Sequence, residues 1–218
     1  YAEPEAQLNV QADRRPTSSR KPTAVVRRRL NMALGPISAF GEVERVTAKL
    51  SEASRVMSED DGSLPDIEFD FGTACLVPVA YSIVMHRATH LVGASNYWST
   101  SLKSEVSFSF GENPAVALEN GEADPFHVLF GGLVSSNGHS IPDLGFFVLS
   151  PSNVAFDYRM GAEWDVEAVI GLFELIQALL ELSATVKLKH VGNLYDNGAM
   201  LAAFKEWSKD AGTRVGPN

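Results

Sequence analysis

The segment from residue 166 to residue 182 constrains the fold most, because apolar residues surround nearly the whole circumference of the helix it would form. Asp165 precedes the segment and suits the N-cap position. A helix this apolar is normally buried on two faces, so we predict a buried helix near residues 165–182. Its apolar positions are Val166, Val169, Ile170, Leu172, Phe173, Leu175, Ile176, Leu179 and Leu180.

The residues from Ile37 to Met57 predict an amphipathic helix. Apolar residues recur there every three or four positions and form one stripe, while charged residues mostly occupy the other faces. Pro36 suits the first turn, and the polar run 58–62 ends the helix. A short third helix is predicted from Ala199 to Trp207.

Strand signals lie between these helices, where the apolar period changes to two. Residues 66–71 alternate strictly between acidic and apolar side chains, which is typical of a strand with one face in water. The apolar run 75–85 contains Pro78, and we predict it as a strand with the proline at an edge or a bulge. Further strands are predicted at residues 105–110, 144–149, 154–158 and 186–189, with a hairpin turn at 150–153 and a loop with at most a short helix at 111–127.

This order of elements predicts an α+β domain with a mainly antiparallel sheet. The N-terminal amphipathic helix and the buried helix near 165–182 are expected to pack on the sheet. No internal repeat or change in composition divides the folded part, so we expect residues 32–218 to form a single domain. Residues 1–31 are rich in Pro, Ser, Thr and Arg without apolar periodicity, and we expect a flexible basic arm there.

The charge of the chain is unevenly distributed. Residues 1–30 hold seven cations and three anions, a net charge of +4, whereas the other 188 residues hold 11 cations and 24 anions, a net charge of −13. An acidic body repels phosphate backbones and attracts cationic surfaces. We therefore expect a basic protein as the partner, and nucleic acid only through residues 14–29.

Composition also bears on compartment and assembly. The single Cys75 rules out an internal disulfide and a zinc site made only of cysteines. Because it lies in an apolar run, we expect its thiol to be buried and inert. No apolar run reaches the about eighteen residues that a membrane span needs, and no export signal is visible. We expect a cytoplasmic protein without a membrane partner. The sequence leaves open whether the chain forms a homo-oligomer.

His86 and His90 have the i, i+4 spacing of zinc ligands on a helix, with His127, His139 or Asp124 available as a third ligand. The glutamate that metalloproteases carry next to the first histidine is missing, however, and the pair follows a predicted strand. Residues four apart in a strand are separated by about 13 Å. We therefore expect no metal ion and no cofactor.

Motifs for a catalytic nucleophile or a phosphate are absent or incomplete. Residues 93–97 begin like the Gly-x-Ser-x-Gly elbow of hydrolases, but Tyr97 stands where the second glycine is needed. Gly131 and Gly132 can present backbone N–H groups to an oxyanion, although such a pair more often allows close packing or a bulge. No Gly-x-Gly-x-x-Gly or Gly-Lys-Ser/Thr sequence occurs. Catalytic residues are therefore not identified.

The alternating carboxylates are the best candidates for a binding surface. Asp66, Glu68 and Asp70 share one face of a strand at a spacing of about 7 Å and repel one another unless cations face them. A solvated edge strand, a basic protein partner or, more remotely, acid/base catalysis fits this pattern. Asp157 and Arg159 are expected to share one side of a later strand, and they complete the predicted partner-binding residues.

Residues 157–164 form a strand-to-helix corner with the sequence Asp-Tyr-Arg-Met-Gly-Ala-Glu-Trp. Together with Asp165 and the run 172–175, this corner faintly resembles the small α+β immunity proteins of bacterial toxin systems. The resemblance implies a non-catalytic inhibitor of a basic toxin.

The leading hypothesis is therefore an acidic protein-binding module, of the immunity type or another. One alternative is an assembly subunit, viral or otherwise, whose basic arm contacts nucleic acid. The other is a hydrolase, which requires histidines and carboxylates to converge in one pocket. The candidates for that pocket are His86, His90, Asp124 and His139.

Overall fold

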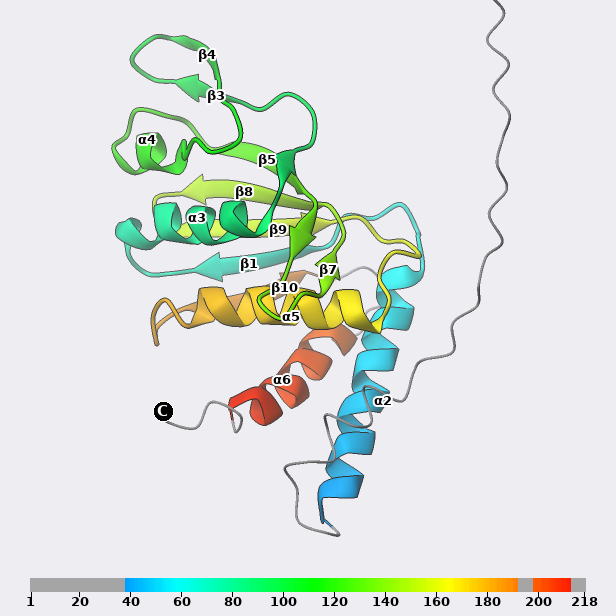
Figure 1. Cartoon of the computed structure of the whole chain (residues 1–218). Coiled ribbons are helices and arrows are strands. Elements are labelled where there is room, and N and C mark those ends of the chain that lie inside the picture. The colour runs from blue at the N-terminus through cyan, green and yellow to red at the C-terminus, as the bar shows by residue number, and fades with distance from the viewer. Residues whose placement is uncertain (1–37, 192–197, 213–218) are drawn as a thin grey trace, which may run out of the picture. The chain divides into compact units, whose positions relative to one another are not determined.

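The computed structural model describes residues 38–191 and 198–212 (Figure 1). The chain divides into two units, Tyr1–Val43 and Glu44–Asn218. Of the first unit only residues 38–43 are described, and they form the beginning of helix α2. The predicted boundary between residues 31 and 32 lies outside the described residues. The sheet and every candidate site among the described residues lie in the second unit.

The described elements are helices and mostly short strands. The helices are α2 (Ser38–Ser58), α3 (Val77–Arg87), α4 (Ala115–Glu119), α5 (Val166–Leu180) and α6 (Ala199–Gly212), with a 3₁₀ turn η1 (Ala74–Leu76) before α3. The strands are β1 (Asp66–Asp70), β2 (His90–Leu91), β3 (Asn96–Ser99), β4 (Ser104–Ser107), β5 (Phe126–Gly131), β6 (Leu133–Val134), β7 (Ser140–Ile141), β8 (Leu144–Ser150), β9 (Asn153–Tyr158) and β10 (Lys187–Val191).

The main sheet has six strands in the order β10-β1-β9-β8-β5-β2, and all its neighbouring pairs are antiparallel. Strands β8 and β9 form the predicted hairpin around residues 150–153. Two small ribbons, β3–β4 and β6–β7, lie outside this sheet. The predicted α+β fold with a mainly antiparallel sheet is therefore confirmed.

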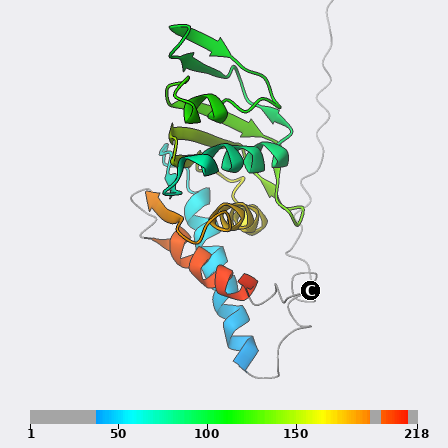
Figure 2. The same ribbon diagram turned by 90° about the vertical axis from the view of Figure 1, so that its left-hand side faces the viewer.

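The core forms between one face of the sheet and helices α3 and α5, which lie on the same side of it (Figures 1 and 2). Tyr81 of α3 is fully buried, and its ring meets Phe130 and Phe146 edge to face at centroid distances of 5.4 and 5.6 Å. Phe69 of β1 and Phe156 of β9 continue this aromatic layer, 5.2 Å apart. Edge-to-face pairs of this kind add to the burial of apolar area.

Helix α5 is buried on two faces, as its sequence predicts. It lies beside α3 and the β6–β7 ribbon, and Phe173 on another face packs against Phe204 of α6 at 5.4 Å. The Asp165 carboxylate accepts a hydrogen bond of 2.8 Å from the backbone N–H of Ala168 and caps the helix. The cap satisfies one of the N–H groups that a helix leaves open at its start.

The amphipathic stripe of α2 is also confirmed for the residues from Glu44 onward. Val46, Leu50, Ala53 and Met57 are buried in the core, while the charged residues between them are mostly exposed. Ser54 Oγ donates a hydrogen bond of 2.8 Å to the carbonyl of Trp164. This bond ties α2 to the corner that precedes α5.

The prediction of a strand at residues 75–85 is wrong, because this segment contains helix α3. Pro78 lies in the first turn of the helix, where a missing N–H breaks no hydrogen bond. Val77, Ala80, Tyr81 and Val84 are buried at helical spacing. Burial against the sheet outweighs the strand preference of the β-branched residues.

Cys75 lies in η1 rather than in a strand, and it is exposed rather than buried. The strand predicted at 105–110 corresponds to β4, which ends at Ser107. Strand β4 pairs with the four residues of β3 in a separate ribbon and does not join the main sheet. Strands β2, β3 and β5–β7 were not predicted. They are short or interrupted by glycine, so period-two alternation barely registers in them.

Candidate functional site

The side of the main sheet opposite α3 and α5 is its outer face (Figure 2). The registers of the strand pairs place the side chains of this face in three rows across the sheet. They are half-buried or exposed, apart from Ala155 and glycines 131 and 145. The outer face comprises Lys187 and Lys189 of β10, Asp66, Glu68 and Asp70 of β1, Asn153, Ala155 and Asp157 of β9, Gly145 and Phe147 of β8, His127, Leu129 and Gly131 of β5, and His90 of β2.

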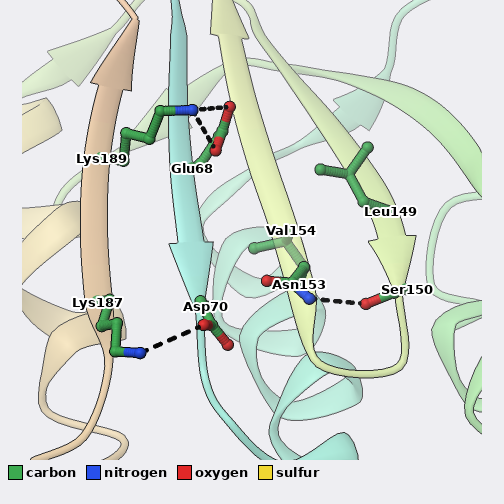
Figure 3. A pocket seen from close by; sticks show the side chains of 8 residues that line it. All are labelled: Glu68, Asp70, Leu149, Ser150, Asn153, Val154, Lys187 and Lys189. Carbon is green, nitrogen blue, oxygen red and sulfur yellow. Dashed lines mark hydrogen bonds and ion pairs between the residues drawn. The ribbon is translucent and has the colours of Figure 1, made fainter.

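The three predicted carboxylates of β1 do share this face, but β1 is an inner strand and not an edge. Lys189 Nζ lies 3.1 Å from both carboxylate oxygens of Glu68, and Lys187 Nζ lies 4.0 Å from Asp70 Oδ2 (Figure 3). The edge strand β10 therefore supplies the cations that this acidic row requires. Two of the three carboxylates are neutralised within the chain.

A shallow hollow of about 540 Å³ lies over these ion pairs, between β10 and the β8–β9 turn. Figure 3 shows the two lysines on one side and Leu149, Ser150 and Asn153 on the other. Asn153 Nδ2 donates to Ser150 Oγ at 2.9 Å. The polar groups of the hollow thus largely bond to one another, and the open hollow has no buried polar group aimed into it.

Asp157 has a partner that the sequence did not suggest. His127 Nε2 lies 2.9 Å from Asp157 Oδ1, so the ring N–H donates to the carboxylate across the intervening strand β8. Gly145 of β8 lies beneath this contact, and a Cβ there would come within 1.6 Å of Asp157 Oδ1. The His127 ring also packs on Phe147, with centroids 4.1 Å apart. The glycine makes the His127–Asp157 pair possible.

Asp66 lies directly opposite Asp157 on the neighbouring strand. Burial raises the pKa of the Asp66 carboxyl, and the negative charges of Asp157 and Glu68 raise it further. The charges of His190 and Lys189 lower the pKa of Asp66, but their effect is smaller and the net shift is upward. The pKa of the Asp66 carboxyl therefore lies above its ordinary value. No hydroxyl or thiol is hydrogen-bonded to the His127 ring in the described part of the chain.

Asp157 and Arg159 are not brought together. Arg159 follows the end of β9, and its guanidinium lies 3.9 Å from Asp60 while remaining 82% exposed. The backbone carbonyl of Arg159 accepts a hydrogen bond of 2.7 Å from the indole of Trp164. Arg159 thus belongs to the corner before α5 and not to the outer face.

Of the four side chains suggested for a hydrolase, the three histidines have separate partners, and among the described residues the Asp124 side chain has none. His86 Nδ1 lies 2.6 Å from the Ser82 carbonyl within α3, and the His90 ring contacts Thr89. His139 lies between two glutamates of α5, 2.7 Å from Glu167 and 3.8 Å from Glu174. Within residues 38–191 and 198–212, no group of three or more histidine, cysteine, aspartate or glutamate residues is placed to hold a metal ion.

A different surface carries unpaired charge. We define the β3–α4 end as residues 96–124, which lie at one end of the second unit in both views (Figures 1 and 2). Lys103 is its single cation, and in the described structure none of its five carboxylates forms an ion pair. The five are Glu105, Glu112, Glu119, Glu122 and Asp124.

The β3–α4 end also exposes apolar side chains. Among the described residues eight large hydrophobic side chains are exposed, and four of them lie in this segment. Trp98 is 43% exposed on β3, in contrast to the fully buried Trp164. This surface was not predicted from the sequence, because it contains neither a catalytic motif nor a strand with regular alternation. The sequence signal for it was the run of five acidic residues between positions 105 and 124, with Lys103 as the single cation nearby. The four exposed hydrophobic side chains of the β3–α4 end are Trp98, Leu102, Phe110 and Val116.

Comparisons of the chain with known proteins found no matching family model, no matching curated protein and no matching solved structure. Among the described residues, no helix is both long and apolar enough to span a bilayer.

Proposed function

We propose that this protein is a non-catalytic binding protein for a basic protein partner, and that the β3–α4 end is its contact surface. The observation that carries the proposal is the charge of that surface: five carboxylates and one lysine, without an ion pair in the described structure. An immunity-type inhibitor of a basic bacterial toxin is one form of such a protein.

The exposed apolar residues support the same surface. Protein interfaces are enriched in aromatic anchors such as tryptophan, which contribute most of the binding energy at their centre. Surrounding charges increase the rate of encounter and select the partner. Trp98 with acidic neighbours has both properties.

The outer face of the sheet is less suited to a basic partner. Lys187 and Lys189 occupy the cationic positions that a partner would need to fill opposite Asp70 and Glu68. A basic partner would have to displace these lysines. Its new ion pairs with Asp70 and Glu68 would then largely replace the ion pairs that the lysines already form. The partner-binding role predicted for Asp66, Glu68, Asp70, Asp157 and Arg159 stays a prediction.

The test uses two triple variants with the same net charge. The first is Glu105→Lys, Glu122→Lys and Asp124→Lys in the β3–α4 end. The second, a control, is Glu44→Lys, Asp143→Lys and Glu163→Lys, three exposed carboxylates elsewhere. Basic proteins captured by the wild-type chain from its source are identified, purified and reconstituted with all three chains at low and high salt.

We expect a complex of fixed stoichiometry whose affinity falls with salt, because ions screen exposed charges. The control variant should bind with nearly wild-type affinity, and the β3–α4 variant should lose binding at least tenfold. Equal losses in both variants, or an affinity that salt does not change, would contradict the proposal.

The hydrolase alternative requires His86, His90, Asp124 and His139 in one pocket, and the separate partners of the three histidines do not support it. No hydroxyl or thiol is bonded to the ring of the His127–Asp157 pair in the described structure. The nucleic-acid alternative depends on residues 14–29, which lie outside the described residues.

A further inference from the structure

We infer that Trp98, Glu105 and Asp124 form a binding site for an arginine side chain of the partner. The inference rests on the proposed function and names the chemical group that this surface recognises. We call these three residues the arginine site.

The backbone places the three side chains in one row. Trp98 of β3 lies opposite Glu105 of β4 in the register of the ribbon. On the other side of β3, the N–H of Asp124 donates to the Trp98 carbonyl at 3.0 Å, and the N–H of Thr100 donates to the Glu122 carbonyl at 3.0 Å. These two bonds pair Trp98 with Asp124, so β3 has a neighbour on each side.

The row points away from the core. Ser99 and Ala123 form the adjacent bridge and are 4% and 7% exposed, so they face inward. Trp98, Glu105 and Asp124 alternate with them and are all exposed. Beneath the row, the half-buried Tyr97 packs on Phe108 and Phe126 at centroid distances of 6.2 and 6.3 Å. The packed aromatic rings thus lie on the opposite side of β3 from the exposed indole.

Cross-strand neighbours have Cβ atoms about 5 Å apart, so the Cβ atoms of Glu105 and Asp124 lie about 10 Å apart, with that of Trp98 between them. The structure gives neither carboxylate a side-chain hydrogen bond or an ion pair within the described residues. An electron-rich ring with an open carboxylate on each side is complementary to a cation.

Arginine fits this row better than lysine. A guanidinium is planar, stacks on an indole face and directs N–H groups outward in its own plane. A stacked guanidinium can therefore donate toward Glu105 on one side and Asp124 on the other. An ammonium is a compact point charge with a stronger hydration shell and cannot reach both carboxylates while it lies over the ring.

The test titrates the full chain with three small cations: N-acetyl-arginine amide, N-acetyl-lysine amide and choline. The readout is the indole N–H signal of Trp98 in NMR spectra, assigned by its absence in the Trp98→Phe variant. Trp164 and Trp207 supply internal references, since Trp164 is buried and its indole donates to Arg159. The variants are Glu105→Gln and Asp124→Asn, with Asp143→Asn as the matched control.

We expect a saturable shift with the arginine probe at low salt, and affinities for the lysine probe and choline at least threefold weaker. Glu105→Gln and Asp124→Asn should each weaken arginine binding about threefold, and Asp143→Asn should leave it unchanged. A Trp98 signal that does not move overturns the inference, and so does a response equal for arginine and choline. So does a response that persists in both site variants.

The two proposals fail separately. A basic partner whose complex the β3–α4 charge reversal abolishes, combined with a Trp98 signal that arginine does not move, overturns the arginine site alone. A specific arginine response without any salt-sensitive complex of a basic protein overturns the proposed function alone.

Discussion

Replacing Gly145 by alanine tests the account of the His127–Asp157 pair. The new Cβ would lie 1.6 Å from Asp157 Oδ1 and 2.5 Å from His127 Nε2, so the hydrogen bond between them would break. Loss of a hydrogen bond to a charged group costs about 1.5–3 kcal/mol, and the lower end applies because the His127 side chain is 37% exposed. Alanine instead of glycine within a strand returns about 0.5–1 kcal/mol. We expect the free energy of unfolding to fall by about 1 kcal/mol.

The same substitution in an Asp157→Ala background provides the control. With the carboxylate removed, the worst overlap disappears and the His127 ring is free to turn outward. Gly145→Ala should then be neutral or stabilise by about 0.5 kcal/mol. Urea unfolding at pH 7 and constant ionic strength, followed by circular dichroism, measures all four chains. An equal loss of stability in both backgrounds would refute the reasoning, because it would show that Gly145 acts independently of the pair.

Three further predictions concern other groups of the second unit. The hydroxyl of Tyr81 is buried without a hydrogen-bond partner in the described structure and burial raises its pKa, so Tyr81→Phe should stabilise the fold by about 1 kcal/mol in urea unfolding. The pKa of Asp66 is raised in the fold, so its contribution to stability is present below its ordinary value of 3.8 and is lost as pH rises through the folded pKa. Asp66→Asn should therefore be more stable than wild type at pH 7, with the difference vanishing below pH 3.8 in a pH series of unfolding curves. Asp165→Ala removes the α5 cap and should lower the free energy of unfolding by about 1 kcal/mol.

Much of the fold could be predicted where pattern and burial agree. The apolar circumference of residues 166–180 predicts α5 and its burial on two faces, and the strict alternation at 66–70 predicts β1. Residues 75–85 misled the interpretation because their β-branched side chains suit a strand in isolation. The sheet needed a covering layer, and a proline in the first turn of α3 is no obstacle to a helix.

The candidate site was harder to predict, because it depends on neighbours distant in sequence. Nothing near Glu68 in the sequence reveals that Lys189 will face it, since 121 residues separate the two. The same holds for His127 and Asp157, which meet only because residue 145 of the strand between them has no side chain. Trp98 and Glu105 are close in sequence, but Asp124 joins them only through the backbone pairing of β3 with residues 122–124.

The central claim is that a basic protein binds at the β3–α4 end, and hydroxyl-radical footprinting of the chain, free and in its reconstituted complex, tests it most directly. Trp98, Leu102 and Phe110 are exposed in that end, while Phe147 lies on the outer face of the sheet and Leu149 lines the hollow beside it. We predict that the complex protects Trp98, Leu102 and Phe110 from oxidation and leaves Phe147 and Leu149 unchanged. Protection of Phe147 and Leu149 with Trp98 as reactive as in the free chain would contradict the account.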